Sequence, residues 1–278
     1  MPQIGVRLHD VAGESASEKM KTARALGFHC IQLAPGKVGL PGDPAALTPG
    51  YARVVGDMMR EAGLGLSVLG CYRSPADEST HAAYEAYLRF AAYLGGCVVG
   101  TETNESPASP MDELCRQMEK IVRTAEKLGV VFAVEPVSRH VLSTPARAKA
   151  LRDSMASPAL QFIFDPVNLV DAAKASAGPD GQGGRKPDLI YLDELFAEYI
   201  EELGPDTAAI HLKDYYMEDG KQVFIPAGTS GGQLPTERIA AWIREKKPYI
   251  DVLLENTVPA TALESRVYAE RLLGIGAE

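Results

Sequence analysis

Four side chains able to bind a metal ion or to move a proton follow apolar runs in the second half of the chain. They are two glutamates, one aspartate and one histidine: Glu135 after VVFAV, Asp165 after LQFIF, His211 after TAAI and Glu255 after YIDVLL. A buried, ionised carboxylate is unfavourable unless something pairs with it. If these groups meet in one pocket, a bound divalent cation is the simplest way to keep three carboxylates ionised.

The chemistry of these four groups also narrows the choice of metal. Carboxylate oxygens with one imidazole and no thiolate suit Mn²⁺, Mg²⁺, Co²⁺ or Fe²⁺ better than a structural zinc ion. We expect Mn²⁺, with the other three ions as alternatives. One polar residue at the end of a strand is ordinary, so the prediction depends on the recurrence of such residues in consecutive runs.

Short apolar runs alternate with longer amphipathic stretches along the whole chain. Eight runs are expected to be strands: residues 4–8, 29–34, 64–70, 97–102, 130–135, 160–165, 207–213 and 249–255. Three of the helix-like stretches between them end in a glycine that can cap a helix, namely Gly27, Gly129 and Gly204. Eight strand–helix units predict an α/β fold, a single (β/α)8 TIM barrel that spans residues 1–278 as one domain.

A barrel would bring the four groups together, because the carboxyl ends of all its strands open at one mouth. Side chains alternate along a strand, so Ala133, Ile163, Ala209 and Leu253 are expected to form an apolar floor beneath them. The competing fold, an open doubly wound sheet, would have a glycine-rich fingerprint after its first strand. The sequence RLHDVAGES does not contain one.

Composition excludes several classes of partner. The chain has 28 basic and 37 acidic residues, a net charge of -9, and no basic stripe, which disfavours nucleic acid and anionic membranes. No apolar stretch approaches the roughly 20 residues of a membrane span, and MPQIGVRLHD lacks the order of a signal peptide. We therefore expect a cytoplasmic protein. The four cysteines show no C-x-x-C spacing and are expected to be free thiols.

The ordered set of motifs resembles a known superfamily. Glu135 in AVEPVSRH, Asp165 in FDPVN, His211 in IHLKD and Glu255 in LLENT look like the pattern of the sugar isomerase/epimerase superfamily with a xylose-isomerase-like barrel. The glycine-rich PAGTSGG after the seventh strand also fits this pattern. The superfamily includes ketose 3-epimerases, hydroxypyruvate isomerases, inosose dehydratases and endonuclease IV.

The resemblance implies a mechanism. Glu135, Asp165, His211 and Glu255 would hold one divalent metal, and Glu135 and Glu255 would act as general acid and base on a keto-sugar or sugar phosphate through an enediolate. It also implies a homo-oligomer. A metal-dependent dehydratase of a polyol ketone, similar to inosose dehydratase, is the main alternative, because it shares the enediolate. A non-catalytic sugar-binding barrel is a lesser one.

Other residues near the predicted strand ends are candidates for binding the sugar: Asn168, Arg139, His140 and Lys213. Many epimerases of the superfamily have a histidine where this chain has Asn168, so the substrate stays open. Weaker candidates are His9, Asp10, Tyr72, Arg73 and Glu102. The lone Trp242 is expected to serve packing.

Two further features bear on function. The low-complexity stretch 174–188 follows the sixth strand, where it is expected to be either a lid or a plain surface loop. The endonuclease branch is disfavoured, because its three-metal site needs several histidines and this chain has five in total, at least two of them away from the predicted strand ends.

Overall fold

Eight parallel strands close into a barrel in the computed structural model, which describes residues 1–179 and 185–275. The strands are β1 (Gln3–Arg7), β2 (Cys30–Leu33), β3 (Gly65–Gly70), β4 (Val98–Glu102), β5 (Val131–Glu135), β6 (Leu160–Phe164), β9 (Thr207–Leu212) and β12 (Asp251–Leu254). Their order around the barrel is β1-β12-β9-β6-β5-β4-β3-β2. Each lies within a predicted run or overlaps it, so the predicted (β/α)8 TIM barrel is confirmed.

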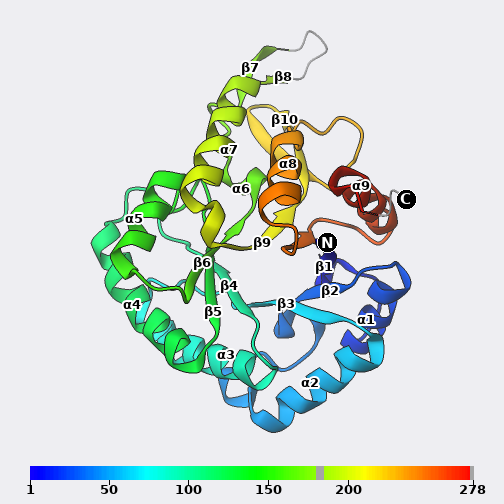
Figure 1. Cartoon of the computed structure of the whole chain (residues 1–278), viewed down its shortest axis with the longest axis vertical. Helices are drawn as coiled ribbons and strands as arrows, with labels where there is room; N and C mark the ends of the chain where they lie inside the picture. The colour runs from blue at the N-terminus through cyan, green and yellow to red at the C-terminus, as the bar shows by residue number, and fades with distance from the viewer. Residues whose placement is uncertain (180–184, 276–278) are drawn as a thin grey trace.

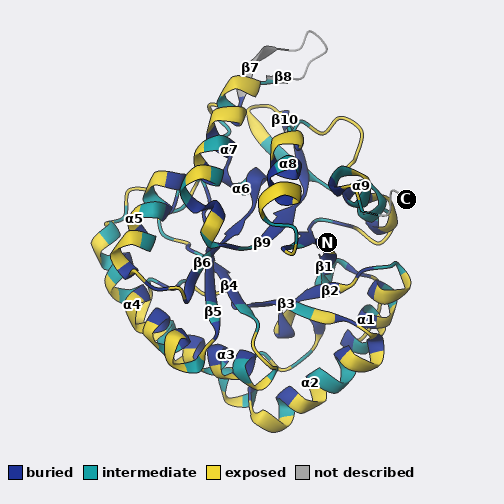
Figure 2. Ribbon diagram, viewed as in Figure 1, coloured by how far each residue is buried: buried dark blue, intermediate teal, exposed yellow. Residues whose placement is uncertain are grey.

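A helix follows each strand and lies outside the barrel (Figure 1). These helices are α1 (Ala16–Ala25), α2 (Pro49–Ala62), α3 (His81–Tyr93), α4 (Met111–Leu128), α5 (Pro145–Met155), α7 (Leu189–Leu203), α8 (Glu237–Lys246) and α9 (Ala262–Leu273). Figure 2 shows the strands buried and the outer faces of the helices exposed. None of the described helices is both long enough and apolar enough to cross a membrane.

The interior of the barrel is filled by a small apolar cluster. It consists of Cys30, Val68, Ala133, Ile163, Ala209 and Leu253. The predicted floor of four apolar residues is thus confirmed. Two glycines let the walls close over it, since a Cβ on Gly5 would lie 2.6 Å from the Cys30 sulfur and one on Gly100 would lie 2.6 Å from a Val68 methyl group.

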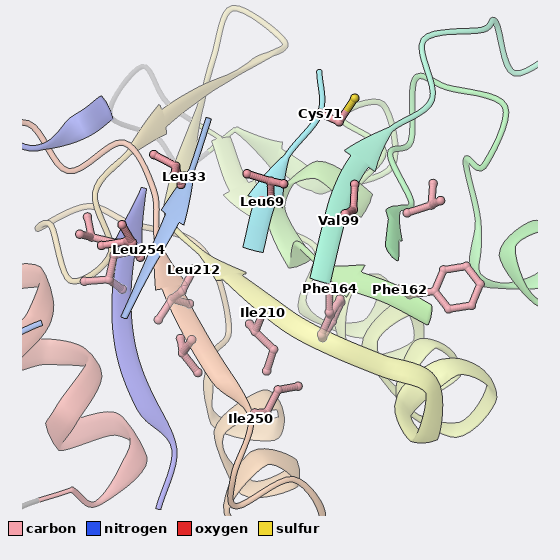
Figure 3. Packing of buried hydrophobic residues seen from close by; sticks show 14 of the residues in the cluster. Leu33, Leu69, Cys71, Val99, Phe162, Phe164, Ile210, Leu212, Ile250 and Leu254 are labelled. Atoms are coloured by element: carbon pink, nitrogen blue, oxygen red, sulfur yellow. The ribbon is translucent and has the colours of Figure 1, made fainter. Parts of the chain in front are cut away.

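A larger core fills the layer between strands and helices. Neighbouring strands β6 and β9 contribute Phe162, Phe164 and Ile210 to it (Figure 3). Phe164 stacks on Tyr199 of α7 with ring centroids 3.9 Å apart and meets the edge of Trp242 at 6.2 Å. Trp242 is therefore a packing residue, as expected from its place in a helix.

The glycines at helix ends have different roles. Gly129 ends α4 with a left-handed φ of 65°, and Gly27 follows α1 with a φ of 89°. Gly204 ends α7 as its C-cap, as predicted, but it has a right-handed φ of −52° and opens a short 3-10 turn. A Cβ there would lie 3.3 Å from the Trp242 ring, which explains the glycine by close packing.

Two hairpins project from the barrel loops. β10 (Asp214–Glu218) and β11 (Lys221–Ile225) pair antiparallel around Asp219 and Gly220, which both have positive φ. The stretch 174–188 contains a second hairpin, β7 (Ser176–Pro179) with β8 (Arg185–Pro187), which extends beyond α7 at the top of Figure 1. Residues 180–184 of that stretch lie outside the described residues, and a lid there stays a prediction.

Candidate active site

The four predicted ligand residues come from neighbouring strands and meet at the barrel mouth. Glu135 ends β5, Asp165 follows β6, His211 lies in β9 and Glu255 follows β12, and all four are buried. Nδ1 of His211 lies 3.0 Å from Oε2 of Glu135 and 3.1 Å from Oε1 of Glu255. The two glutamates therefore approach one imidazole nitrogen from different strands.

Lys213 occupies the centre of this cluster. Its ammonium donates to the Asp165 carboxylate and to Oε2 of Glu255, the latter at 2.8 Å. Burial disfavours its charge, but Asp165 and Glu255 more than compensate and raise the pKa of Lys213 above its usual value. The side chain therefore stays protonated and supplies a fixed positive charge among the carboxylates.

A second cation reaches Glu255 from the first strand. One guanidinium nitrogen of Arg7 lies 3.2 Å from Oε2 of Glu255. Burial alone would raise the pKa of Glu255, but Lys213, His211 and Arg7 outweigh it and lower that pKa below its usual range. Burial disfavours the charged form of His211 and alone would lower its pKa. Glu255 and Glu135 outweigh this effect and raise the pKa of His211.

Three of the four residues form a group that fits a metal ion. Ligand atoms of Glu135, Asp165 and His211 all lie within 4.8 Å of one another, and all three residues are buried. Nε2 of His211 is buried and has no hydrogen-bond partner among the described residues. Two carboxylates and an imidazole suit a divalent cation. Glu255 lies outside this group, and its carboxylate contacts Lys213 and Arg7.

Asp165 and Asn168 connect two strands of the site. Oδ1 of Asp165 accepts the backbone N–H of Asn168 at 2.9 Å, which caps the short helix α6 (Pro166–Leu169). The side-chain amide of Asn168 donates to Oε1 of Glu135 at 2.5 Å. Asn168 is predicted to bind the sugar. In the structure, its side-chain amide holds the carboxylate of Glu135 in place.

A cavity of about 170 Å³ lies above the cluster and is lined by Glu135, His211 and Glu255. Of the residues predicted to bind the sugar, Asn168, Arg139 and Lys213 line it. His140, the fourth residue predicted to bind the sugar, does not line the cavity. Its Nδ1 lies 3.8 Å from Oε2 of Glu102.

Glu102 is a second carboxylate of the cavity wall. It lies opposite Glu135 in the β4–β5 pair. Burial and the charge of Glu135 raise the pKa of Glu102 to about 7. Burial and the charge of Arg139 lower the pKa of the neighbouring His140. This wall therefore carries a carboxyl group that titrates near neutral pH.

Among the residues that line the cavity, sequence reasoning missed Arg7, Phe224 and Asn256. A charged residue in the apolar run IGVRL could have pointed to Arg7. The Asp219–Gly220 pair between β-rich segments is a typical hairpin turn, and it could have predicted the strand that contains Phe224. Asn256 carried no such signal.

Asn256 has an unusual backbone held by specific contacts. Its φ is 57°, a conformation that costs energy for a residue with a side chain. Its backbone N–H donates to Asp10 at 2.9 Å, and its side-chain oxygen accepts from Arg7 at 3.2 Å. These contacts fix the turn directly after Glu255, which explains the presence of Asp10 near the mouth.

The chain resembles a known family in sequence and solved structures in fold. The sequence pattern of the xylose isomerase-like TIM barrel family matches residues 20–267. No curated protein matches the chain in sequence.

Solved structures share the fold at low identity. A D-tagatose 3-epimerase-like protein is 16% identical with a TM-score of 0.73, covering 98% of this chain and 97% of its own. A xylose isomerase-like TIM barrel protein from Mycobacterium smegmatis, in complex with magnesium, is 17% identical with a TM-score of 0.71 over 98% and 97%. D-psicose 3-epimerase, in the presence of D-fructose, is 14% identical with a TM-score of 0.69 over 98% and 99%. With the family pattern matching most of its length, this chain belongs to the xylose isomerase-like TIM barrel family.

Proposed function

We propose that this protein is a divalent-metal-dependent isomerase or epimerase that acts on a keto-sugar or sugar phosphate through an enediolate. The observation that carries the proposal is the position of Glu135 and Glu255, which flank His211 and line the same cavity. Two carboxylates on different strands can serve one bound carbon, one removing a proton and the other returning it. D-psicose 3-epimerase and a D-tagatose 3-epimerase-like protein among the structural neighbours support this reaction class.

Glu135, Asp165 and His211 would hold the metal, and we propose Glu255 as a fourth ligand. When bound, a divalent cation acts as a Lewis acid that makes the C–H bond next to the substrate carbonyl more acidic. We propose Mn²⁺ as the native ion, with Mg²⁺, Co²⁺ and Fe²⁺ as alternatives. The magnesium complex of one structural neighbour supports a divalent ion in this fold.

The chain's own residues prepare the two carboxylates for proton transfer. Lys213 and Arg7 keep Glu255 ionised, which is the state that accepts a proton. Asn168 fixes one oxygen of Glu135, which leaves its other oxygen toward His211. Orientation of this kind matters because proton transfer requires a donor and acceptor within hydrogen-bond reach.

The cavity wall also contains an aromatic side chain. Phe224 of the β10–β11 hairpin lines the cavity, and its ring centroid lies 5.4 Å from the ammonium of Lys213. An aromatic side chain there limits the access of water to the enediolate. We propose that Arg139 and Lys213 contact substrate oxygens in the same cavity.

Proton NMR in D₂O with added Mn²⁺ tests the proposal on a panel of ketoses and ketose phosphates. An isomerase or epimerase incorporates deuterium at the carbon next to the carbonyl with no loss of water. Loss of water would instead indicate the dehydratase. A protein that binds no metal and exchanges no C–H proton on any member of the panel would contradict both enzymes and favour a sugar-binding barrel.

A further inference from the structure

A second cavity adjoins the first one at the barrel mouth. It encloses about 540 Å³ between the loops that follow β2 and β3. Tyr72 lines both cavities, so the two are neighbours across one side chain. The first cavity, at about 170 Å³, is smaller than the roughly 300–1,000 Å³ of most ligand pockets, so a ligand of ordinary size would extend into the second.

Two cations without carboxylate partners line the second cavity. Lys37 and Arg73 form no ion pair with any residue of the described parts of the chain. Other exposed arginines, such as Arg60 and Arg89, do pair with a neighbouring carboxylate. On a protein with a net charge of -9, two unpaired cations that line one cavity create a local positive region.

Asp43 is the one acidic residue among those that line this cavity, and its carboxylate already accepts a hydrogen bond. The carboxylate of Asp43 accepts the backbone N–H of Ala45 at 2.9 Å and so caps a short 3-10 turn. Gly36, Gly42 and Gly70 form much of the remaining wall, where the absence of side chains leaves room for a ligand. The cavity is therefore open, positively charged and bordered by backbone.

Both cations sit on rigid supports. The backbone oxygen of Arg73 accepts hydrogen bonds from the hydroxyls of Tyr84, at 2.5 Å, and Thr101, at 3.0 Å. The ammonium of Lys37 lies 3.8 Å from the centre of the Tyr72 ring, whose hydroxyl accepts from Gln32 at 2.9 Å. These contacts fix the backbone of Arg73 and place the Lys37 ammonium beside Tyr72, while both cationic side chains are exposed to a ligand.

We propose that this second cavity binds an anionic group at the far end of the keto-sugar, a phosphate or a carboxylate, through Lys37 and Arg73. The inference rests on the proposed function and names the substrate class for the same site. Tyr72 would lie beside the middle of such a substrate, with the carbonyl end at Glu135 and Glu255. Charge-assisted contacts from a lysine and an arginine are the usual means of recognising phosphate or carboxylate in proteins.

The substrate arm of the test compares three ketoses with the same carbon number: D-fructose, D-fructose 6-phosphate and a keto-uronate. We expect kcat/KM for C–H exchange to be at least about tenfold higher for one of the anionic sugars than for D-fructose. A preference for the phosphate identifies a sugar phosphate, and a preference for the keto-uronate identifies a sugar acid. Equal kcat/KM for all three would overturn the proposal.

The variant arm assigns the preference to the two cations. Lys37→Gln and Arg73→Gln should each reduce the preference for the anionic sugar by about tenfold, and Arg73→Lys should restore part of it. Arg116→Gln removes an exposed charge on α4 and should leave the preference unchanged. A preference that survives the Lys37 and Arg73 substitutions would place the anion elsewhere and refute the assignment.

A binding measurement separates this inference from the proposed activity. Calorimetric titration with inorganic phosphate should show binding to the wild-type protein that weakens at high ionic strength and is lost in the double variant Lys37→Gln/Arg73→Gln. Phosphate binding of this kind without any C–H exchange would reject the enzyme and keep the anion site. Exchange on D-fructose with no phosphate binding and no anionic preference would keep the enzyme and reject the anion site.

Discussion

The ammonium nitrogen of Lys213 lies 2.8 Å from Oε2 of Glu255, and both side chains are buried at the barrel mouth. The same ammonium contacts Asp165, so one lysine neutralises part of the charge of two proposed metal ligands. A buried cation beside a metal site limits the charge that the ion must balance. We expect it also to make the folded protein less dependent on a bound ion.

Replacing Lys213 tests this relationship. Lys213→Met leaves Asp165 and Glu255 without their cation, and loss of one partner of a buried ion pair costs about 3–5 kcal/mol. We expect a lower Tm in the metal-free protein and a larger rise in Tm on adding Mn²⁺ than in the wild type. Lys174→Gln, which removes an exposed lysine, is the control. An unchanged Tm for Lys213→Met would contradict the role of the ion pair.

The proposed acid/base pair predicts the effect of isosteric substitutions. Glu135→Gln and Glu255→Gln should each reduce the rate of C–H exchange by about 10²- to 10⁴-fold, because an amide cannot accept the proton. Circular dichroism and calorimetry should show a retained fold and some metal binding. Glu85→Gln, in an exposed ion pair on α3, serves as the matched control. Near-normal exchange in either active-site variant would rule out the two-base mechanism.

Asn168 allows a test between positioning and substrate binding. Removing its amide in Asn168→Ala deletes the hydrogen bond to Glu135, which is worth about 1.5–3 kcal/mol for a charged acceptor. If Asn168 mainly positions Glu135, kcat falls by about tenfold or more while KM changes little. A rise in KM with kcat preserved would show instead that the amide binds the sugar.

Glu102 predicts a dependence of stability on pH in the metal-free protein. Burial and Glu135 raise its pKa from 4.5 to about 7, so between these values the folded protein binds a proton that the unfolded chain has released. The stabilising contribution is therefore present at low pH and is lost as pH rises toward 7. We expect the free energy of unfolding to fall across this range by up to about 1 kcal/mol per pH unit, reduced by screening at a partly exposed site.

Denaturant titrations of the wild type and Glu102→Gln between pH 5 and 8 measure this contribution. The glutamine cannot titrate, so the difference between the two curves isolates Glu102 from the other acidic groups. The wild type should lose stability relative to the variant as pH rises. Parallel curves over the whole range would show that the carboxyl group titrates normally.

Gly232 predicts a steric effect at the base of the β10–β11 hairpin. The Asp214 carboxylate accepts backbone N–H groups from Tyr215 at 2.7 Å, Gln233 at 3.0 Å and Leu234 at 2.9 Å. A Cβ on Gly232 would collide with this carboxylate, so Gly232→Ala should cost about 1–3 kcal/mol of stability.

Gly50→Ala is the matched control for that substitution. Gly50 lies in the first turn of α2, where a Cβ would have its nearest neighbour at 3.9 Å. Alanine there should be neutral or stabilising by about 0.5–1 kcal/mol, because it reduces the freedom of the unfolded chain. Urea unfolding of both variants gives the comparison. Equal stability of Gly232→Ala and the wild type would mean that the Asp214 contacts rearrange without cost.

The sequence predicts much of the barrel because its signals are local. Alternation within each apolar run places Ala133 and Ile163 inward, and the strand ends then place Glu135 and Asp165 at one mouth, as the structure confirms. The roles of these residues in catalysis and metal binding stay predictions, as do the single-domain extent of residues 1–278 and the oligomeric state.

Other features depend on contacts between distant residues, which local patterns do not encode. The ion pair between Lys213 and Glu255 joins residues 42 positions apart, and the Arg7–Glu255 contact joins the two ends of the chain. The close packing at Gly204 has the same origin, since a Cβ there would crowd the ring of Trp242 on α8. The β10–β11 hairpin does not depend on distant contacts, because its Asp219–Gly220 turn is a local signal from which the hairpin could be predicted.

The two hydrogen bonds of Asn168 have a consequence for attempts to change the proposed sugar preference. Its backbone belongs to the turn capped by Asp165, and its side chain donates a hydrogen bond to Glu135. A substitution at position 168 that reshapes the cavity would therefore also move the proposed catalytic groups. We therefore expect substitutions at this position to change specificity and reactivity together. Arg139 and Phe224 line the same cavity with no hydrogen bond or ion pair to these carboxylates in the described structure, which makes them the better starting points for redesign.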